Sequence, residues 1–187
     1  MRTSAAESGP ARRARLAGLY AIVGGPDAVA RAGAALAGGA RVVQVRVKDA
    51  PAGEILDVAR RIVALARPAG ALVLVNDRPD LALLSGADGV HVGDDDLPPA
   101  EARRLLGPDL LVGRTSRTLE EAEAALAAGA DHVGFGPIFG TRSKALDVAP
   151  RGVEALRAAC ARLPAPVVAI GGITEANVAE VAAAGAR

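Results

Sequence analysis

From Leu16 onward the chain alternates two kinds of segment, and this alternation limits the folds open to it. Runs rich in β-branched residues, predicted as strands, occupy residues 19–23, 41–47, 72–75, 89–92, 110–112, 132–135 and 167–170. The segments between them, rich in Ala, Leu, Arg and Glu, are predicted as helices over about 26–38, 52–67, 79–85, 98–106, 118–128, 150–161 and 174–184. Strands that alternate with helices indicate βαβ units around a parallel sheet.

A repeated Gly-Ala-(Asp/Arg) phrase marks where several of these units begin. It precedes the second, fourth and sixth predicted strands and returns at Gly185-Ala186-Arg187. We expect each glycine of the phrase to end a helix with positive φ. The pattern predicts an α/β fold, a TIM (β/α)8-type barrel over residues 16–187 that lacks the eighth strand and helix at the C-terminus. Such an open barrel is expected to be poorly stable. The competing doubly wound sheet usually carries a G-x-G-x-x-G phrase after its first strand, which this chain lacks.

Composition narrows the possible partners. The net charge is only +1 and aromatic residues make up 2% of the chain, which argues against nucleic-acid binding. No stretch of about 20 apolar residues is present, so no membrane partner is expected. A single cysteine, Cys160, fits a cytoplasmic protein. Residues 1–15 are polar and Arg-rich, and we interpret them as a flexible tail. The sequence leaves open whether the protein is a homo-oligomer.

The second predicted strand carries the most informative polar pattern. Gln44, Arg46 and Lys48 alternate with three valines, so the polar and apolar side chains occupy opposite faces. In a barrel the valines should pack on helices, and the polar residues should point inward and form an anion site. An edge strand with a solvated face is the alternative.

Acidic residues follow the next two strands. Asn76 and Asp77 end the third strand, and the acidic run 94–96 follows the fourth. Barrel enzymes place their chemistry at these carboxyl ends, and Mg²⁺ commonly takes one or two carboxylates together with substrate phosphate. Asp77 and one residue of the acidic run would make such a half-site. Ordinary turn and helix-cap roles remain the alternative.

Glycine-rich segments follow the later strands. Residues 134–144 combine glycines with two hydroxyls and two cations, and Gly171-Gly172 ends the seventh strand. Both suit a phosphate group, which backbone N–H groups can approach closely. His91 and His132 lie within strands and are interpreted as barrel-lining or core residues, with a catalytic acid–base role as the alternative.

Five phrases together resemble the thiamine-phosphate synthase family, in the family's order and over about residues 19–187. They are Gln44-x-Arg46-x-Lys48-Asp49, Val75-Asn76-Asp77, Ala87-Asp88-Gly89-Val90-His91-Val92-Gly93, Gly136-Pro137-Ile138-Phe139-Gly140-Thr141-x-Ser143-Lys144 and Ala169-Ile170-Gly171-Gly172-Ile173.

The resemblance implies a role for each matching residue. The pyrimidine diphosphate would be bound by Gln44, Arg46, Lys48, Asn76, Thr115 and Lys144, and the thiazole phosphate by Thr141, Ser143 and the Gly172 amide. Asp77 and Asp96 would hold Mg²⁺. In the implied reaction pyrophosphate leaves, and the thiazole nitrogen then attacks the pyrimidine methyl cation. Arg46, Lys48 and Lys144 would be the catalytic residues, because they stabilise charge on the departing pyrophosphate.

The chain departs from the family pattern at three points. Asp94 stands where Gln is frequent, Thr115 stands where Ser is frequent, and the final strand and helix are absent. Two other functions are therefore kept: a thiazole tautomerase-like enzyme, and a non-catalytic protein that binds thiamine precursors. The Asp77–Asp96 pair favours the synthase, and the absent end favours the non-catalytic reading.

Overall fold

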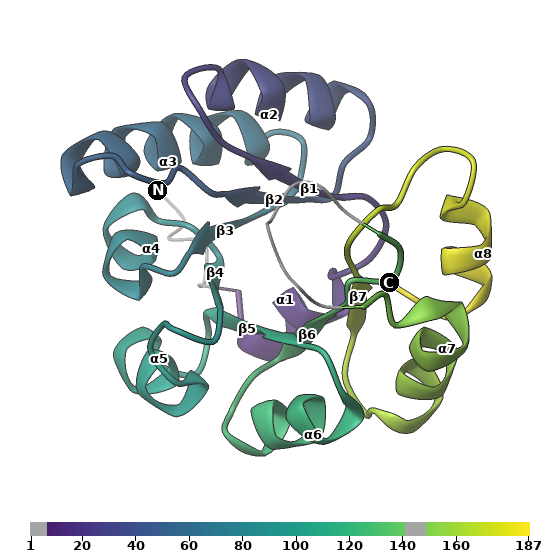
Figure 1. Cartoon of the computed structure of the whole chain (residues 1–187). Coiled ribbons are helices and arrows are strands. Elements are labelled where there is room, and N and C mark those ends of the chain that lie inside the picture. The colour runs from purple at the N-terminus through teal and green to yellow at the C-terminus, as the bar shows by residue number, and fades with distance from the viewer. Residues whose placement is uncertain (1–6, 141–148) are drawn as a thin grey trace. The chain divides into compact units, whose positions relative to one another are not determined.

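The computed structural model describes residues 7–140 and 149–187. The chain divides into two compact units, residues 1–112 and 113–187. Each unit is built from parallel strands joined by helices (Figure 1). Among the described residues, no helix has both the length and the apolar character required to cross a membrane.

The first unit holds four complete strands whose order in space follows their order in the chain. β1 pairs with β2, β2 with β3 and β3 with β4, all in parallel. The strands are β1 (Tyr20–Val23), β2 (Val42–Val45), β3 (Leu72–Asn76) and β4 (Gly89–Val92). The connecting helices are α2 (Ala28–Ala37), α3 (Ala52–Ala66), α4 (Pro79–Ser85) and α5 (Pro99–Leu106). Every strand and helix predicted for this part of the chain is present, with ends shifted by a few residues.

The two faces of this sheet bury different side chains. Val43 and Val45 belong to the core formed with the helices, and Val47 packs against the edge of that core. Val42 lies in a separate cluster on the opposite face, with residues 16, 72, 74 and 111. Gln44 shares the parity of Val42 along the strand and is likewise buried. The register predicted for this strand is therefore confirmed.

The repeated glycine phrase has the backbone expected of it. Gly39, Gly86, Gly129 and Gly185 have φ values of 89°, 72°, 98° and 99°. At the first three, the glycine N–H donates to the carbonyl three residues earlier. The N–H of the alanine that follows donates to the carbonyl five residues before it. This pair of bonds is the Schellman termination of a helix. The phrase thus turns a helix end into a strand entrance at each repeat.

The second unit continues the same alternation of parallel strands and helices. β5 (Leu111–Ser116) enters it, and there β5 pairs with β6 (His132–Phe135), which pairs with β7 (Val167–Ala169). Its helices are α6 (Leu119–Ala127), α7 (Gly152–Arg162) and α8 (Val178–Ala183). Thr118 caps the start of α6, because its Oγ1 accepts the N–H of Glu121 at 3.2 Å.

Two predicted boundaries were wrong in this unit. β5 runs to Ser116 instead of ending near residue 112, so Thr115 lies within the strand. α8 begins at Val178, four residues later than predicted. The cause of the late start is Asn177, whose side chain accepts the N–H of Thr174 at 2.7 Å and donates to the carbonyl of Gly172 at 3.0 Å. These bonds hold residues 172–177 in a turn.

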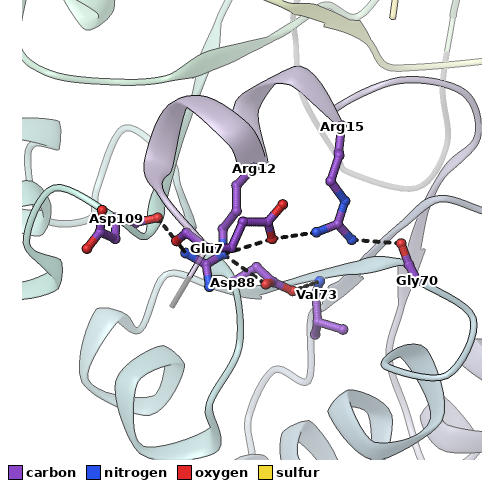
Figure 2. A network of polar contacts seen from close by, with 7 residues as sticks. All are labelled: Glu7, Arg12, Arg15, Gly70, Val73, Asp88 and Asp109. Atoms are coloured by element: carbon purple, nitrogen blue, oxygen red, sulfur yellow. Dashed lines mark hydrogen bonds and ion pairs between the residues drawn. The ribbon is translucent and has the colours of Figure 1, made fainter. Parts of the chain in front are cut away.

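The expectation of a flexible tail over residues 1–15 was wrong for its second half. Residues Gly9–Ala14 form helix α1, which lies against the first unit (Figure 2). Arg12 Nε lies 3.1 Å from Asp88 Oδ1, and Arg15 donates to the carbonyl of Gly70 at 2.7 Å. Leu16, directly after the helix, is only 2% exposed. One long-range ion pair, one long-range hydrogen bond and one buried leucine therefore anchor a segment whose local composition resembles a solvated tail.

Asp88 joins α1 to the sheet through both of its carboxylate oxygens. One oxygen meets Arg12, and the other accepts the backbone N–H of Val73 at 2.9 Å (Figure 2). Replacing Asp88 by alanine removes the ion-pair partner of Arg12, which keeps its bonds to the carbonyls of Glu7 and Asp109, and leaves the Val73 N–H without its acceptor.

We expect Asp88→Ala to lower the free energy of unfolding by about 2–3 kcal/mol, measured by urea denaturation. Asp88→Asn keeps an acceptor for Val73 and should lose less. Arg61→Ala removes an exposed ion pair with Asp57 and serves as the control, with an expected loss below about 0.5 kcal/mol. Equal losses in all three variants would contradict the anchoring role.

Candidate functional site

The side chain of Gln44 is held by Tyr20, a residue for which the sequence had suggested no role. Gln44 is 3% exposed, and its Nε2 donates to the Tyr20 hydroxyl at 2.8 Å. Burial raises the pKa of Tyr20 well above its ordinary value, so the hydroxyl stays neutral. Tyr20 on β1 pairs in register with Val42, which has the parity of Gln44, so the two polar side chains lie on the same face; the register that joins them comes from the structure and not from the sequence. The pair sets the orientation of the glutamine amide.

Arg46 and Lys48 lie just beyond the carboxyl end of β2. The Arg46 N–H donates to the carbonyl of Val23 at 2.8 Å, which extends the pairing with β1 by one step. Gly24 permits this close approach, since a Cβ there would lie 2.2 Å from the Arg46 carbonyl oxygen. Lys48 is half-exposed, and its Nζ lies 3.8 Å from Asp77 Oδ2. Lys48 of the second strand thus lies beside Asp77, one of the two proposed metal ligands.

Asp77 and Asp96 come together at the carboxyl ends of β3 and β4, as expected. Their side chains are in hydrogen-bonding contact, and Asn76 also donates to Asp77. The Asp77 backbone is left-handed, with φ of 63°, and its N–H donates to the carbonyl of His91 at 2.8 Å. A left-handed aspartate is uncommon and is typical of a functional position. Asp96 accepts the N–H of Gly93 through Oδ2 at 2.7 Å.

The electrostatics of this contact favour a proton or a cation between the two carboxylates. The pKa of Asp77 is raised to about 6, first by burial, then by the hydrogen bond and the negative charge of Asp96. The positive charge of Lys48 and the Asn76 bond oppose this rise without cancelling it. The pair is therefore held in contact at an electrostatic cost.

The donor set suits Mg²⁺ better than a softer metal. In residues 7–140 and 149–187, no cluster of three or more His, Cys, Asp or Glu side chains could hold a metal by itself. Mg²⁺ keeps several waters and binds through one or two carboxylates plus substrate phosphates. Two carboxylates in contact fit that pattern, with the remaining positions left to water and a diphosphate.

The second unit carries the remaining predicted residues. Thr115 lies on β5, one residue before Ser116, whose carbonyl accepts the N–H of Gly136 at 3.2 Å. Gly172 has φ of 66°, and a Cβ there would lie 2.5 Å from the Gly140 carbonyl oxygen. Only glycine fits this turn, because the φ is positive and the backbone of Gly140 lies close. Thr141, Ser143 and Lys144 lie outside the described residues, and their roles stay predictions.

We expect Asp77→Asn to stabilise the metal-free protein by about 1 kcal/mol at pH 7.5, allowing for partial solvent screening. Asparagine tolerates the left-handed backbone and removes the like-charge contact. Between about pH 4 and 6 the native wild type binds more protons than its unfolded chain, so its stability falls as pH rises through that window. Asp77→Asn has no carboxyl group to ionise at this position, so its free energy of unfolding does not fall in the same way.

Urea denaturation at pH 4 and pH 7.5 checks this expectation. The advantage of Asp77→Asn should be present at pH 7.5 and absent at pH 4. Asp95→Asn, which removes an exposed neighbouring carboxylate, is the control and should show no such change. If Asp77→Asn were more stable than wild type by the same amount at both pH values, the ionised Asp77 carboxylate would not be the cause of the lost stability.

Comparisons with known proteins agree on one family. A family model described as thiamine monophosphate synthase matches residues 19–187. Thiamine-phosphate synthase of Anaeromyxobacter dehalogenans (strain 2CP-C) is 70% identical over 186 residues, which cover 100% of this chain and 83% of that protein. Thiamine-phosphate synthase of Myxococcus xanthus (strain DK1622) is 54% identical over 159 residues, which cover 85% and 73%.

One solved structure supports the predicted fold class. The thiamine phosphate pyrophosphorylase from Pyrococcus furiosus matches with a TM-score of 0.82 and 36% identity, over 89% of this chain and 81% of that one. The predicted α/β fold of the TIM-barrel type is therefore confirmed.

Proposed function

We propose that this chain, which belongs to the thiamine monophosphate synthase family, joins hydroxymethylpyrimidine diphosphate to thiazole phosphate with Mg²⁺ held by Asp77 and Asp96. The family, the transferase class and the function of thiamine-phosphate synthesis agree with the predictions made from the sequence. Its partners are accordingly small molecules. The proposal places the protein in the cytoplasm, which its single cysteine supports.

The observation that carries the metal part is the contact between Asp77 and Asp96, with Lys48 beside it. Two carboxylates alone would repel a diphosphate. A divalent cation between them cancels their charge, and Lys48 then makes the local charge positive. Mg²⁺, when bound there, would neutralise negative charge on the diphosphate oxygens.

The chain's own residues are proposed to bind the pyrimidine diphosphate and to stabilise its departure. The bond between the pyrimidine methylene carbon and the diphosphate oxygen breaks, and pyrophosphate leaves with the electron pair. Arg46 and Lys48 hold the charge that gathers on it, while Gln44, fixed by Tyr20, presents its amide to the pyrimidine. The thiazole nitrogen then attacks the methylene cation, and no proton transfer is needed.

Asp77→Ala should abolish Mg²⁺-dependent formation of thiamine phosphate while the fold stays intact, because one of the two proposed ligands is lost. The assay mixes both substrates with and without Mg²⁺ and measures thiamine phosphate, with circular dichroism as the check on folding. Asp95→Ala, at an exposed neighbouring carboxylate, should retain the activity. Unchanged turnover in Asp77→Ala would rule out its metal role.

Lys144→Ala should raise the barrier of the chemical step by about 2–4 kcal/mol, as the loss of one charge-directed donor does in other enzymes. Single-turnover kinetics isolates that step. Lys144→Arg keeps the positive charge and should recover part of the rate. A change confined to the affinity for thiazole phosphate would assign Lys144 to ground-state binding instead.

A further inference from the structure

We infer that Gly93 is a positioning residue for the metal half-site: its amide aims the Asp96 carboxylate, and its missing side chain leaves room for that carboxylate. The inference rests on the proposed Mg²⁺ site. It adds a residue that touches neither metal nor substrate and acts only through Asp96.

The first observation is the hydrogen bond itself. The Gly93 N–H donates to Asp96 Oδ2 at 2.7 Å, a short bond to a charged acceptor. The backbone closes the same turn, because the Asp96 N–H points back to the Gly93 carbonyl at 3.4 Å. A carboxylate tied to the backbone three residues earlier has little rotational freedom. Its orientation toward Asp77 is thus set before any cation arrives.

The second observation is the lack of space around Gly93. A Cβ built on this residue would lie 3.0 Å from Asp96 Oδ2, tighter than ordinary van der Waals contact. The Gly93 backbone is not left-handed, so alanine could adopt its conformation. The methyl group of an alanine here would push the carboxylate oxygen of Asp96 by a few tenths of an ångström.

A displacement of that size matters because the backbone of Asp77 is held in place. The N–H of Asp77 is held by the His91 carbonyl at 2.8 Å, and its backbone is fixed in the left-handed region. Mg²⁺ demands near-ideal octahedral geometry with oxygens at about 2.0–2.1 Å. A shift of one carboxylate against a fixed partner therefore weakens the metal site without disturbing the core.

The test compares Gly93→Ala with Gly33→Ala. Gly33 lies in α2, where a Cβ would meet nothing within 4 Å and the backbone is not left-handed. Mn²⁺ alone is titrated into each protein and followed by electron paramagnetic resonance. The Mg²⁺ concentration that half-activates turnover is measured separately. We expect Gly93→Ala to weaken Mn²⁺ binding and to raise the Mg²⁺ requirement about tenfold, as changes to residues that orient a metal ligand do. Gly33→Ala should change neither.

The outcomes separate the two claims. Equal Mn²⁺ affinity in wild type and Gly93→Ala would overturn the positioning role and leave the metal site standing. Wild type that binds no Mn²⁺ would overturn the metal site and the inference together.

A second measurement does not depend on the folding of Gly93→Ala. In Asp96→Ala, the amide proton resonance of Gly93 should move upfield, because its short bond to a carboxylate is lost, while that of Gly33 stays in place. A Gly93 resonance that does not move would overturn the inference.

Discussion

Two carboxylates in contact repel each other, so the contact between Asp77 and Asp96 must be enforced by the rest of the structure. The enforcement comes from backbone groups: the His91 carbonyl holds the amide of Asp77, and the Gly93 amide holds the carboxylate of Asp96. Burial, followed by the hydrogen bond and the negative charge of Asp96, raises the pKa of Asp77 to about 6. The simplest explanation for two carboxylates held in an unfavourable contact is a cation that binds between them and offsets their negative charge.

The repeated βα construction makes this enforcement possible. Schellman turns at Gly39 and Gly86 lead the chain into β2 and β4 in the same way. Because β2, β3 and β4 pair in parallel, their carboxyl ends fall at one edge of the sheet. Valines lock each strand to its helices on one face. The residues that follow the strands are then free to be polar. Lys48, Asp77 and Asp96 occupy that edge, and α1 adds support through Asp88 at the entrance to β4.

Much of this could be predicted from local pattern. The period of two in residues 43–48 fixed which side chains face the helices, and the position of Asp77 after its strand indicated where it would lie. Non-local features could not be predicted in this way. Arg12 finds Asp88 from 76 residues away, so a helix formed where composition indicated a tail. Asn177 delays α8 through bonds to residues 172 and 174. The role of Gly93 depends on a distance of 3.0 Å that no pattern of residue types encodes.

The most direct test of the account is to locate the cation itself. Crystals of the protein grown with Mn²⁺ and inorganic pyrophosphate would show the ion by its anomalous scattering. The account predicts a peak between the carboxylates of Asp77 and Asp96, with pyrophosphate oxygens completing its coordination and Lys48 beside them. A peak elsewhere, or Asp77 and Asp96 still in mutual contact with no ion between them, would contradict it.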